Sequence, residues 1–256
     1  MKFKLALITA LVINLVFCAS TQKKIEESRK KSPRYNYSMG SFYLNAGNVD
    51  QAIKYFNKSL SLDPNYYLAL NGLGLAYSMK GKFSESEKYF LKCLAINPNF
   101  SEARNNLGMV YQEMGLVNKA EQQFRLAASD KNYNSRELPY YNLARLYFAQ
   151  DKLEEAINYV ELALRLDSSM AMAYNLKGII LEKQNKLDEA IANYEKGIKI
   201  IPDDLYLNFN LAVAYFKNKE LAKAKSLFEK ISPKVTDLDM KKKIKDYLKM
   251  IKKSKQ

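Results

Sequence analysis

The stretch that decides the fold is residues 67–100, YLALNGLGLAYSMKGKFSESEKYFLKCLAINPNF. Gly74, Tyr77 and Phe90 of this stretch have an identical residue 34 positions earlier and another 34 positions later. The recurring residues are Gly40, Gly74 and Gly108; Tyr43, Tyr77 and Tyr111; and Phe56, Phe90 and Phe124. A period of this length is typical of a solenoid, in which each repeat buries its apolar face only by stacking on its neighbours. The sequence therefore predicts an all-α chain of stacked helix pairs.

Six units follow this period, with residues 135–136 inserted between the third and the fourth. The units are 33–66, 67–100, 101–134, 137–170, 171–204 and 205–238. In each unit the apolar residues have the spacing of two short helices joined by a turn. A small residue recurs in every first helix, where it lets the second helix approach closely: Gly40, Gly74, Gly108, Ala144, Gly178 and Ala212. The pattern resembles the tetratricopeptide repeat (TPR). That resemblance implies a right-handed superhelix of six repeats over residues 35–238, with the first helices on its inner wall.

The turn in the middle of each unit is expected to contain one residue with left-handed backbone, because one helix ends there and the next begins at once. The residues at this position are Gly47, Gly81, Gly115, Asp151, Asn185 and Lys219. Glycine, asparagine and aspartate tolerate this conformation. Lys219 is the poorest fit of the six.

An apolar run near the start of the chain indicates export. Two lysines precede the run Leu5–Phe17, and Cys18 follows it directly. This pattern is typical of a secretory signal peptide over residues 1–17, because a membrane-spanning helix needs ~20 apolar residues. The stretch Leu15–Cys18 resembles the lipobox of bacterial lipoproteins, which implies that Cys18 becomes the lipidated first residue. Ordinary cleavage after Ser20, with loss of Cys18, is the rival interpretation.

The net charge of +14 is concentrated at the two ends of the chain. Residues 18–34 are polar and charged, and we expect them to form a tether. Residues 239–256 hold eight lysines and two aspartates, and their apolar residues share one helical face. We expect a basic amphipathic helix and tail that cap the last exposed apolar face of the array, with a membrane-surface helix as the alternative. A nucleic-acid partner is not expected, because the basic residues of the repeats are almost balanced by acidic ones and leave no basic stripe there.

Catalysis is not expected, because the chain contains no histidine. This absence removes histidine-based acid–base chemistry and the usual metal clusters. Every glycine is explained by the repeat, so no glycine-rich phosphate loop is present. We therefore predict no enzyme activity, no cofactor and no metal site. Cys93 occupies a position where other units carry a small residue, which indicates a buried side chain with a packing role.

The informative surface is the first-helix wall, which we define as positions two, five, nine and twelve of each first helix. These positions share one helical face. The residues that we predict to bind a partner protein or peptide there are Tyr37, Asn71, Asn105, Met109, Tyr141, Phe148, Asn175, Phe209 and Phe216. An exposed groove of this apolar and aromatic content normally marks a partner site. The alternative is that about half of the apolar side chains pack between neighbouring first helices.

Three asparagines occupy position five of the first helix: Asn71, Asn105 and Asn175. A carboxamide at this position can pair with both the N–H and the C=O of a guest backbone. The arrangement resembles the asparagine ladders with which some TPR arrays hold extended peptides. A polar residue that faces water is the equally weighted alternative.

Six TPR units behind a lipoprotein-like signal resemble the pilotin lipoproteins of type IV pilus biogenesis. The resemblance implies an exported scaffold that is anchored to the outer membrane, faces the periplasm and assists assembly of the secretin pore. Two alternatives remain open. One is a generic periplasmic scaffold or cochaperone that binds exposed peptide segments. The other is a cytosolic TPR adaptor, which requires that the N-terminal segment is not processed.

Overall fold

The computed structural model describes residues 31–254 and contains thirteen α-helices and no strand within them. The first helices of the six repeats are α2 (Pro33–Asn45), α4 (Tyr67–Met79), α6 (Ser101–Glu113), α8 (Glu137–Ala149), α10 (Ala171–Lys183) and α12 (Leu205–Lys217). The second helices are α3 (Val49–Leu62), α5 (Phe83–Ile96), α7 (Val117–Ser129), α9 (Leu153–Leu166), α11 (Leu187–Ile200) and α13 (Leu221–Ile231). A short 3-10 turn, η1 (Ser232–Lys234), leads to α14 (Leu238–Lys253). The predicted all-α architecture of paired helices is confirmed.

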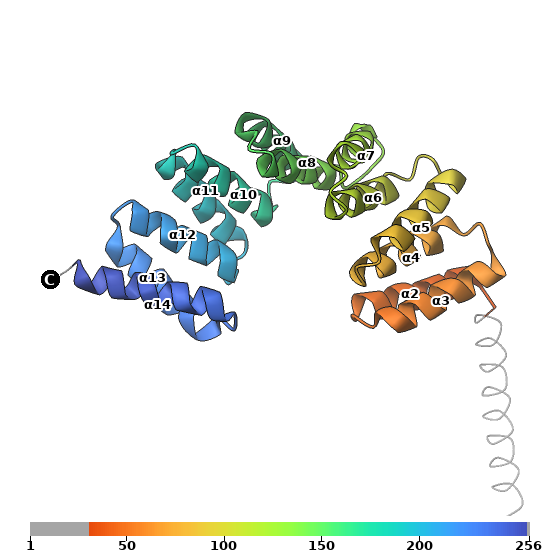
Figure 1. Cartoon of the computed structure of the whole chain (residues 1–256), viewed down its shortest axis with the longest axis horizontal. Coiled ribbons are helices and arrows are strands. Elements are labelled where there is room, and N and C mark those ends of the chain that lie inside the picture. The colour runs from red at the N-terminus through yellow and green to blue at the C-terminus, as the bar shows by residue number, and fades with distance from the viewer. Residues whose placement is uncertain (1–30, 255–256) are drawn as a thin grey trace, which may run out of the picture. The chain divides into compact units, whose positions relative to one another are not determined.

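The described residues belong to two compact units, and the boundary falls between Leu116 and Val117, in the turn from α6 to α7. The first unit holds α2–α6 and the second holds α7–α14. Within each repeat of a unit, the first and second helices lie side by side, as α2 and α3 or α10 and α11 do in Figure 1. The predicted signal segment, residues 1–17, and Cys18 lie outside the described residues.

The recurring small residues face the recurring aromatic rings. Phe56 in α3 is fully buried, and a Cβ added to Gly40 of the same repeat would lie 2.5 Å from its ring. The same ring also meets Gly72, in the next repeat, where an added Cβ would lie 2.6 Å away. Gly74 faces Phe90 in the same manner. Each ring therefore fills a space that exists only because the facing residue has no side chain.

All six mid-repeat turns have one residue with positive φ, as predicted. Gly47, Gly81 and Gly115 have φ of 76°, 69° and 72°. Asp151, Asn185 and Lys219 have φ of 62°, 61° and 61°. Lys219 is thus held in a conformation that a residue with a Cβ adopts only at a steric cost.

Substitution of Lys219 by glycine is expected to raise the free energy of unfolding by up to about 1 kcal/mol. Removal of the Cβ relieves a left-handed strain of ~1–2 kcal/mol, and the greater freedom of glycine in the unfolded chain offsets part of the gain. Urea titration followed by circular dichroism measures the change. Lys219→Ala is the control, because it keeps the Cβ and should give no gain. Equal stabilisation by both variants would contradict the argument.

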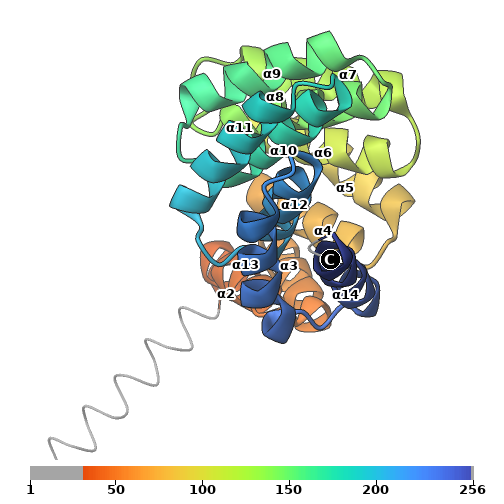
Figure 2. The ribbon, with the colours of Figure 1, turned by 90° about the vertical axis from the view of Figure 1, so that its left-hand side faces the viewer.

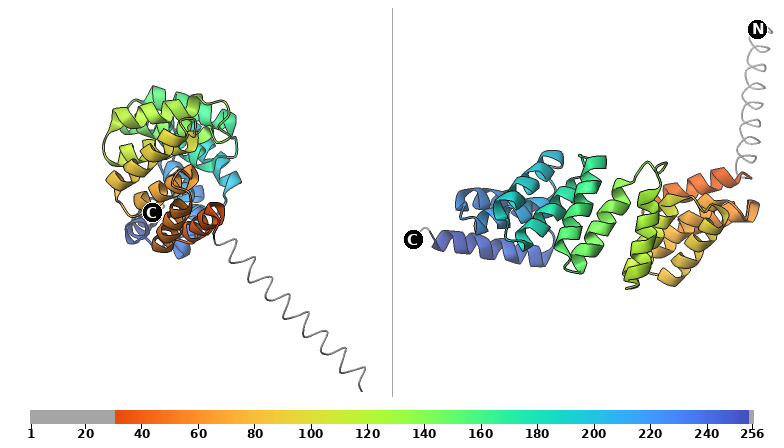
Figure 3. Two further views of the ribbon diagram at one scale, coloured as in Figure 1. Left: turned by 90° about the vertical axis from the view of Figure 1, so that its right-hand side faces the viewer. Right: turned by 90° about the horizontal axis from the view of Figure 1, so that it is seen from above.

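The last helix caps the second unit. Ile244 and Ile251 of α14 are each 1% exposed, and Tyr247 and Leu248 pack against the core formed with α12 and α13. Figure 2 shows α14 end-on beside α13, and in the right-hand view of Figure 3 the same helix runs along the last repeat. All seven lysines of α14 are exposed. The expectation of a basic capping helix is confirmed.

Residues 31–254 contain neither a candidate membrane-spanning helix nor a candidate metal cluster. No helix in this range combines the length and the apolarity that a bilayer-spanning segment needs. No group of three or more histidine, cysteine, aspartate or glutamate side chains in the same range is placed to hold a metal ion. Cys93 is a buried free thiol, and its burial raises the pKa to about 12, so it remains protonated at neutral pH.

Candidate functional site

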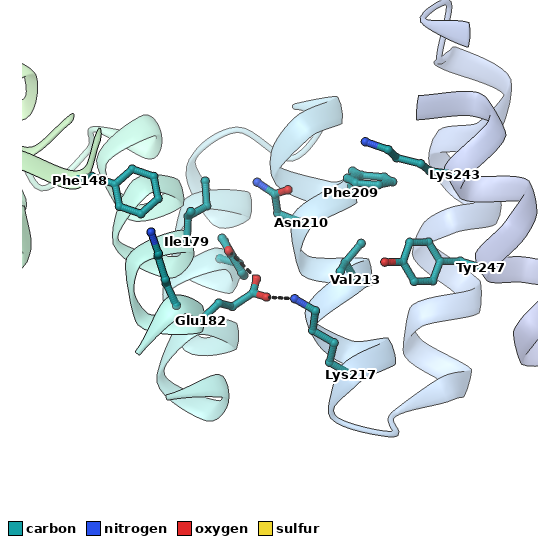
Figure 4. Close-up of a pocket in the computed structure, with 11 residues that line it drawn as sticks. Phe148, Ile179, Glu182, Phe209, Asn210, Val213, Lys217, Lys243 and Tyr247 are labelled. Atoms are coloured by element: carbon teal, nitrogen blue, oxygen red, sulfur yellow. Dashed lines mark hydrogen bonds and ion pairs between the residues drawn. The ribbon is translucent and has the colours of Figure 1, made fainter. Parts of the chain in front are cut away.

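The largest concave site described on the second unit lies between the first helices α8, α10 and α12 and the capping helix α14. We call it the cationic pocket, and its volume is about 620 Å³. Its lining residues are Phe148, Ile179, Glu182, Lys183, Tyr194, Phe209, Asn210, Val213, Lys217, Lys243 and Tyr247. Figure 4 shows Phe148 on one side, Tyr247 on the other, and Ile179 and Val213 between them. The pocket has the size and the mixed apolar and polar lining that are typical of binding sites.

Helical spacing explains how the repeats supply this lining. Phe209, Val213 and Lys217 lie four residues apart on α12 and therefore share one face of the helix. Ile179 and Lys183 have the same relation on α10. Phe209, Val213 and Ile179 occupy positions of the first-helix wall, whereas Lys183 and Lys217 lie one residue beyond its last position. The capping helix then closes one side of the pocket with Lys243 and Tyr247.

Glu182 organises the polar side of the cationic pocket. Its Oε1 accepts a hydrogen bond of 2.7 Å from the Tyr194 hydroxyl, and its Oε2 lies 2.6 Å from Nζ of Lys217. The Glu182 side chain is 15% exposed. Burial and the hydrogen bond to Glu182 raise the pKa of Tyr194, so the phenol remains a donor. Both carboxylate oxygens are therefore engaged before any guest arrives.

The other two lysines of the pocket differ in their partners. Nζ of Lys183 lies 2.6 Å from Asp151 and 5.4 Å from the centre of the Phe148 ring. Lys243 projects from α14 toward Phe209 (Figure 4), and no carboxylate of residues 31–254 lies within ion-pair distance of it. The pocket thus carries three ammonium groups, of which two are already paired.

A second pocket, of about 500 Å³, lies at the N-terminal ends of α10 and α12. Met172 and Tyr206 line it and are 53% and 65% exposed. Asn175 also lines it, and its Oδ1 accepts a hydrogen bond of 2.8 Å from Asn210, which lines the cationic pocket. The asparagine pair therefore connects the linings of the two pockets.

The expectation for two of the three asparagines needs correction. Asn71 is 4% exposed, its Nδ2 donates to Glu102 at 3.0 Å and its Oδ1 accepts from Asn106 at 3.3 Å. Asn105 is 3% exposed. Asn71 is not presented to a guest backbone, because Glu102 and Asn106 of the neighbouring first helix engage it, and Asn105 is too deeply buried to reach one. Only Asn175 of the three is half-exposed and lines a pocket.

The predicted aromatic anchors separate into two groups. Phe148 and Phe209 line the cationic pocket. Phe216 instead packs edge-on against Tyr247, with 5.0 Å between ring centres, and it lines none of the pockets described here. Phe209 also contacts the buried ring of Phe228, at 6.0 Å between ring centres, so it belongs partly to the core. Phe148 is therefore the better probe of binding.

The remaining predicted residues lie outside these two pockets. Tyr141 is half-buried beneath Arg145, whose guanidinium carbon is 6.0 Å from the ring centre. Tyr37 is half-buried against Phe56 and Tyr66, and Met109 is also half-buried. Sequence reasoning missed Lys217, Lys243 and Tyr247. The lysine-rich face of α14 could have indicated Lys243 as a binding residue. Which residues Lys243 faces, however, depends on how α14 packs against the last repeat.

Three models of helical repeat families match almost the whole described chain. Two are tetratricopeptide repeat models, at residues 33–99 and 89–122. The third is the C-terminal ARM domain of tetratricopeptide repeat protein 21, at residues 125–246. The matches begin at the first helix of the first repeat and end within α14.

Similarity to curated proteins is confined to parts of the chain. The tetratricopeptide repeat domain-containing protein PYG7 of Arabidopsis thaliana is 37% identical over 65 residues, which are 25% of this chain and 22% of that protein. The chain spans between 12% and 30% of the length of the four curated relatives that it matches. Their names are therefore no guide to the activity of the whole chain.

Solved structures match most of the chain in fold. PilF of Pseudomonas aeruginosa is 19% identical with a TM-score of 0.75, and the match covers 86% of this chain and 99% of that one. PilW, a type IV pilus biogenesis factor, is 17% identical with a TM-score of 0.72, covering 83% and 97%. YrrB, a TPR protein with an unusual peptide-binding site, is 19% identical with a TM-score of 0.53, covering 75% and 97%.

Proposed function

We propose that this chain, which is a tetratricopeptide repeat protein, holds a segment of a partner protein on the first helices of its C-terminal unit. The TPR fold is a scaffold for protein–protein interaction, and this chain resembles PilF and PilW in fold. The observation that carries the proposal is the cationic pocket, where Phe148, Phe209 and Tyr247 surround an open volume of about 620 Å³. Aromatic side chains in such a site supply most of the binding energy in many interfaces.

The partner that we propose is a secretin of the type IV pilus system. PilW is a type IV pilus biogenesis factor, and the structural match with this chain covers 97% of PilW. The apolar run Leu5–Phe17, followed by Cys18, supports export and lipidation. The chain would then be a lipoprotein of the outer membrane that faces the periplasm. The tether would be residues 18–32, two residues shorter than the sequence predicts, because α2 begins at Pro33. Its role is assembly rather than catalysis.

A generic periplasmic scaffold is the second candidate. It is favoured by the exposed apolar side chains of Met172 and Tyr206 in the second pocket, which extend the apolar surface along the wall. YrrB, a TPR protein of related fold, has an unusual peptide-binding site. A scaffold of this kind would bind many exposed segments rather than one secretin.

Purification of the tagged, full-length protein from detergent-solubilised membranes of its own organism separates the two candidates. We expect the secretin to be the most enriched partner in the mass spectrum, with no enrichment from cells that lack the tagged protein. A broad set of unrelated partners without the secretin would favour the generic scaffold. Recovery of neither would reject the proposed function.

Phe148→Ala is expected to weaken secretin capture by about tenfold or more, which corresponds to ~1.4 kcal/mol, because truncation of a central aromatic anchor commonly costs this much. The side chain is half-buried and contacts Lys183, so the helical circular-dichroism signal should survive. Phe42→Ala is the matched control, because Phe42 lies in the other unit and is 62% exposed. An equal loss of capture in both variants, or none in Phe148→Ala, would place the partner elsewhere.

A further inference from the structure

We propose that the cationic pocket selects a partner segment in which an apolar side chain lies next to an internal acidic side chain, with Lys243 as the residue that pairs with the carboxylate. This inference rests on the proposed function and deepens it, because it states the chemistry of the guest.

The walls of the pocket fit an apolar side chain. Phe148, Ile179, Phe209, Val213 and Tyr247 come from four different helices and surround the same volume. Tyr247 is held by stacking on the fully buried Phe228, with 5.1 Å between ring centres. The Tyr247 ring is therefore held in place before the guest arrives, and an apolar group that enters between the walls is removed from water on several sides.

The lining of the pocket has an excess of positive charge. Three lysines and one glutamate line it. Lys217 is neutralised by Glu182 at 2.6 Å, and Lys183 is paired with Asp151 at 2.6 Å. Lys243 has no such partner among the described residues, and it extends toward the apolar wall at Phe209 (Figure 4). A guest carboxylate beside an apolar anchor would supply the missing charge at the place where the anchor binds.

A basic or neutral guest fits less well. The Glu182 carboxylate cannot readily attract a guest lysine, because both of its oxygens already have partners and its side chain is 15% exposed. Other lysines of α14, including Lys242 and Lys245, are exposed and add to the positive potential of this helix. A positively charged guest would therefore be repelled, and a neutral polar guest would leave Lys243 unpaired.

The test measures binding of short peptides to the full-length protein by fluorescence anisotropy. The probe is an acetylated and amidated peptide with a central phenylalanine between two glutamates, so that its only carboxylates are those of side chains. Comparison peptides replace the glutamates by glutamine or lysine, or the phenylalanine by serine. We expect the glutamate peptide to bind at least about tenfold more tightly than the glutamine peptide. The lysine and serine peptides should bind more weakly still.

Two protein variants locate the effect. Lys243→Gln should lose about tenfold in affinity for the glutamate peptide and nothing for the glutamine peptide, because only the former has the carboxylate that Lys243 would pair with. Lys249→Gln is the matched control. It removes the same charge from the same helix, but Lys249 is exposed and does not line the pocket. Both positions are exposed, so both variants should keep the wild-type melting temperature.

Three outcomes overturn the inference, and a fourth supports it while it removes the secretin as the partner. Equal losses in the two variants would mean that only the overall charge of α14 matters. If no peptide binds, but vesicles of anionic phospholipid are bound and lose binding equally in both variants, α14 is a lipid-facing surface. If no peptide binds but the secretin is still captured, the proposed guest chemistry is wrong and the proposed function is retained. If the acidic peptide binds as described but no secretin is recovered, the secretin assignment falls alone.

Discussion

Phe228→Ala is expected to remove about 3–5 kcal/mol from the free energy of unfolding of the C-terminal unit, the usual cost of truncating a buried phenylalanine. Phe228 is fully buried in α13. Its ring stacks on Tyr247 of α14, with 5.1 Å between centres, and meets Phe209 of α12 at 6.0 Å. One side chain thus joins the last repeat to the capping helix, so its loss should also release α14.

Urea titration followed by circular dichroism measures the loss, and hydrogen exchange at the amides of α14 shows whether that helix is released. Phe42→Ala is the control, because Phe42 is 62% exposed and its truncation should change the free energy of unfolding by no more than about 0.5 kcal/mol. The stability of a repeat depends mainly on its immediate neighbours. The amides of α2–α5 should therefore keep nearly the same protection from hydrogen exchange in the Phe228 variant. A loss of stability similar to that of the control would mean that α14 does not depend on this contact.

Cys18→Ser is expected to move the protein from the membrane fraction to a soluble fraction. The apolar run Leu5–Phe17 ends directly at Cys18, which leads us to propose that this residue becomes the lipidated N-terminus. Two acyl chains anchor a protein stably, whereas one chain gives only marginal binding. The serine variant would lose the thiol to which lipid is attached, and the rest of the chain would be unchanged.

Cys93→Ser is the matched control for this experiment. Cys93 is the only other cysteine, and it is buried with its pKa raised to about 12, so it is not available for modification. That variant should stay in the membrane fraction. Mass spectrometry of the wild-type N-terminus gives an independent answer. A mature protein that starts at Thr21 without lipid would end the lipoprotein proposal and leave ordinary signal cleavage.

Local sequence is enough to predict the helices and turns of the repeats. The first helices begin at Pro33, Tyr67, Ser101, Glu137, Ala171 and Leu205, the first residue of each predicted unit. The period also predicts the left-handed backbone of Lys219, although lysine alone gives no reason to expect it. Position in the repeat decides this conformation, because two antiparallel helices joined by so short a turn require it.

The candidate site is less predictable from the sequence. Whether a side chain is exposed depends on the residues that pack beside it, and helical spacing does not identify those residues. Asn71 and Asn175 occupy the same repeat position, yet Asn71 is buried between Glu102 and Asn106, whereas Asn175 lines a pocket. Phe209 and Phe216 both belong to the predicted wall, but only Phe209 lines the cationic pocket. The difference arises from the side chains that pack beside each residue.

The sequence by itself determines that this chain consists of paired helices in six repeats, because a small residue and an aromatic ring at a fixed interval can be buried only when the helices stack. Only the tertiary structure decides where a guest can bind. Lys243 and Tyr247 lie more than thirty residues from Phe209 in the sequence, and they share a pocket with it because Ile244 and Ile251 bury one face of α14 against the last repeat. Burial of that face fixes the rotation of α14, and this rotation places one unpaired lysine beside the apolar wall.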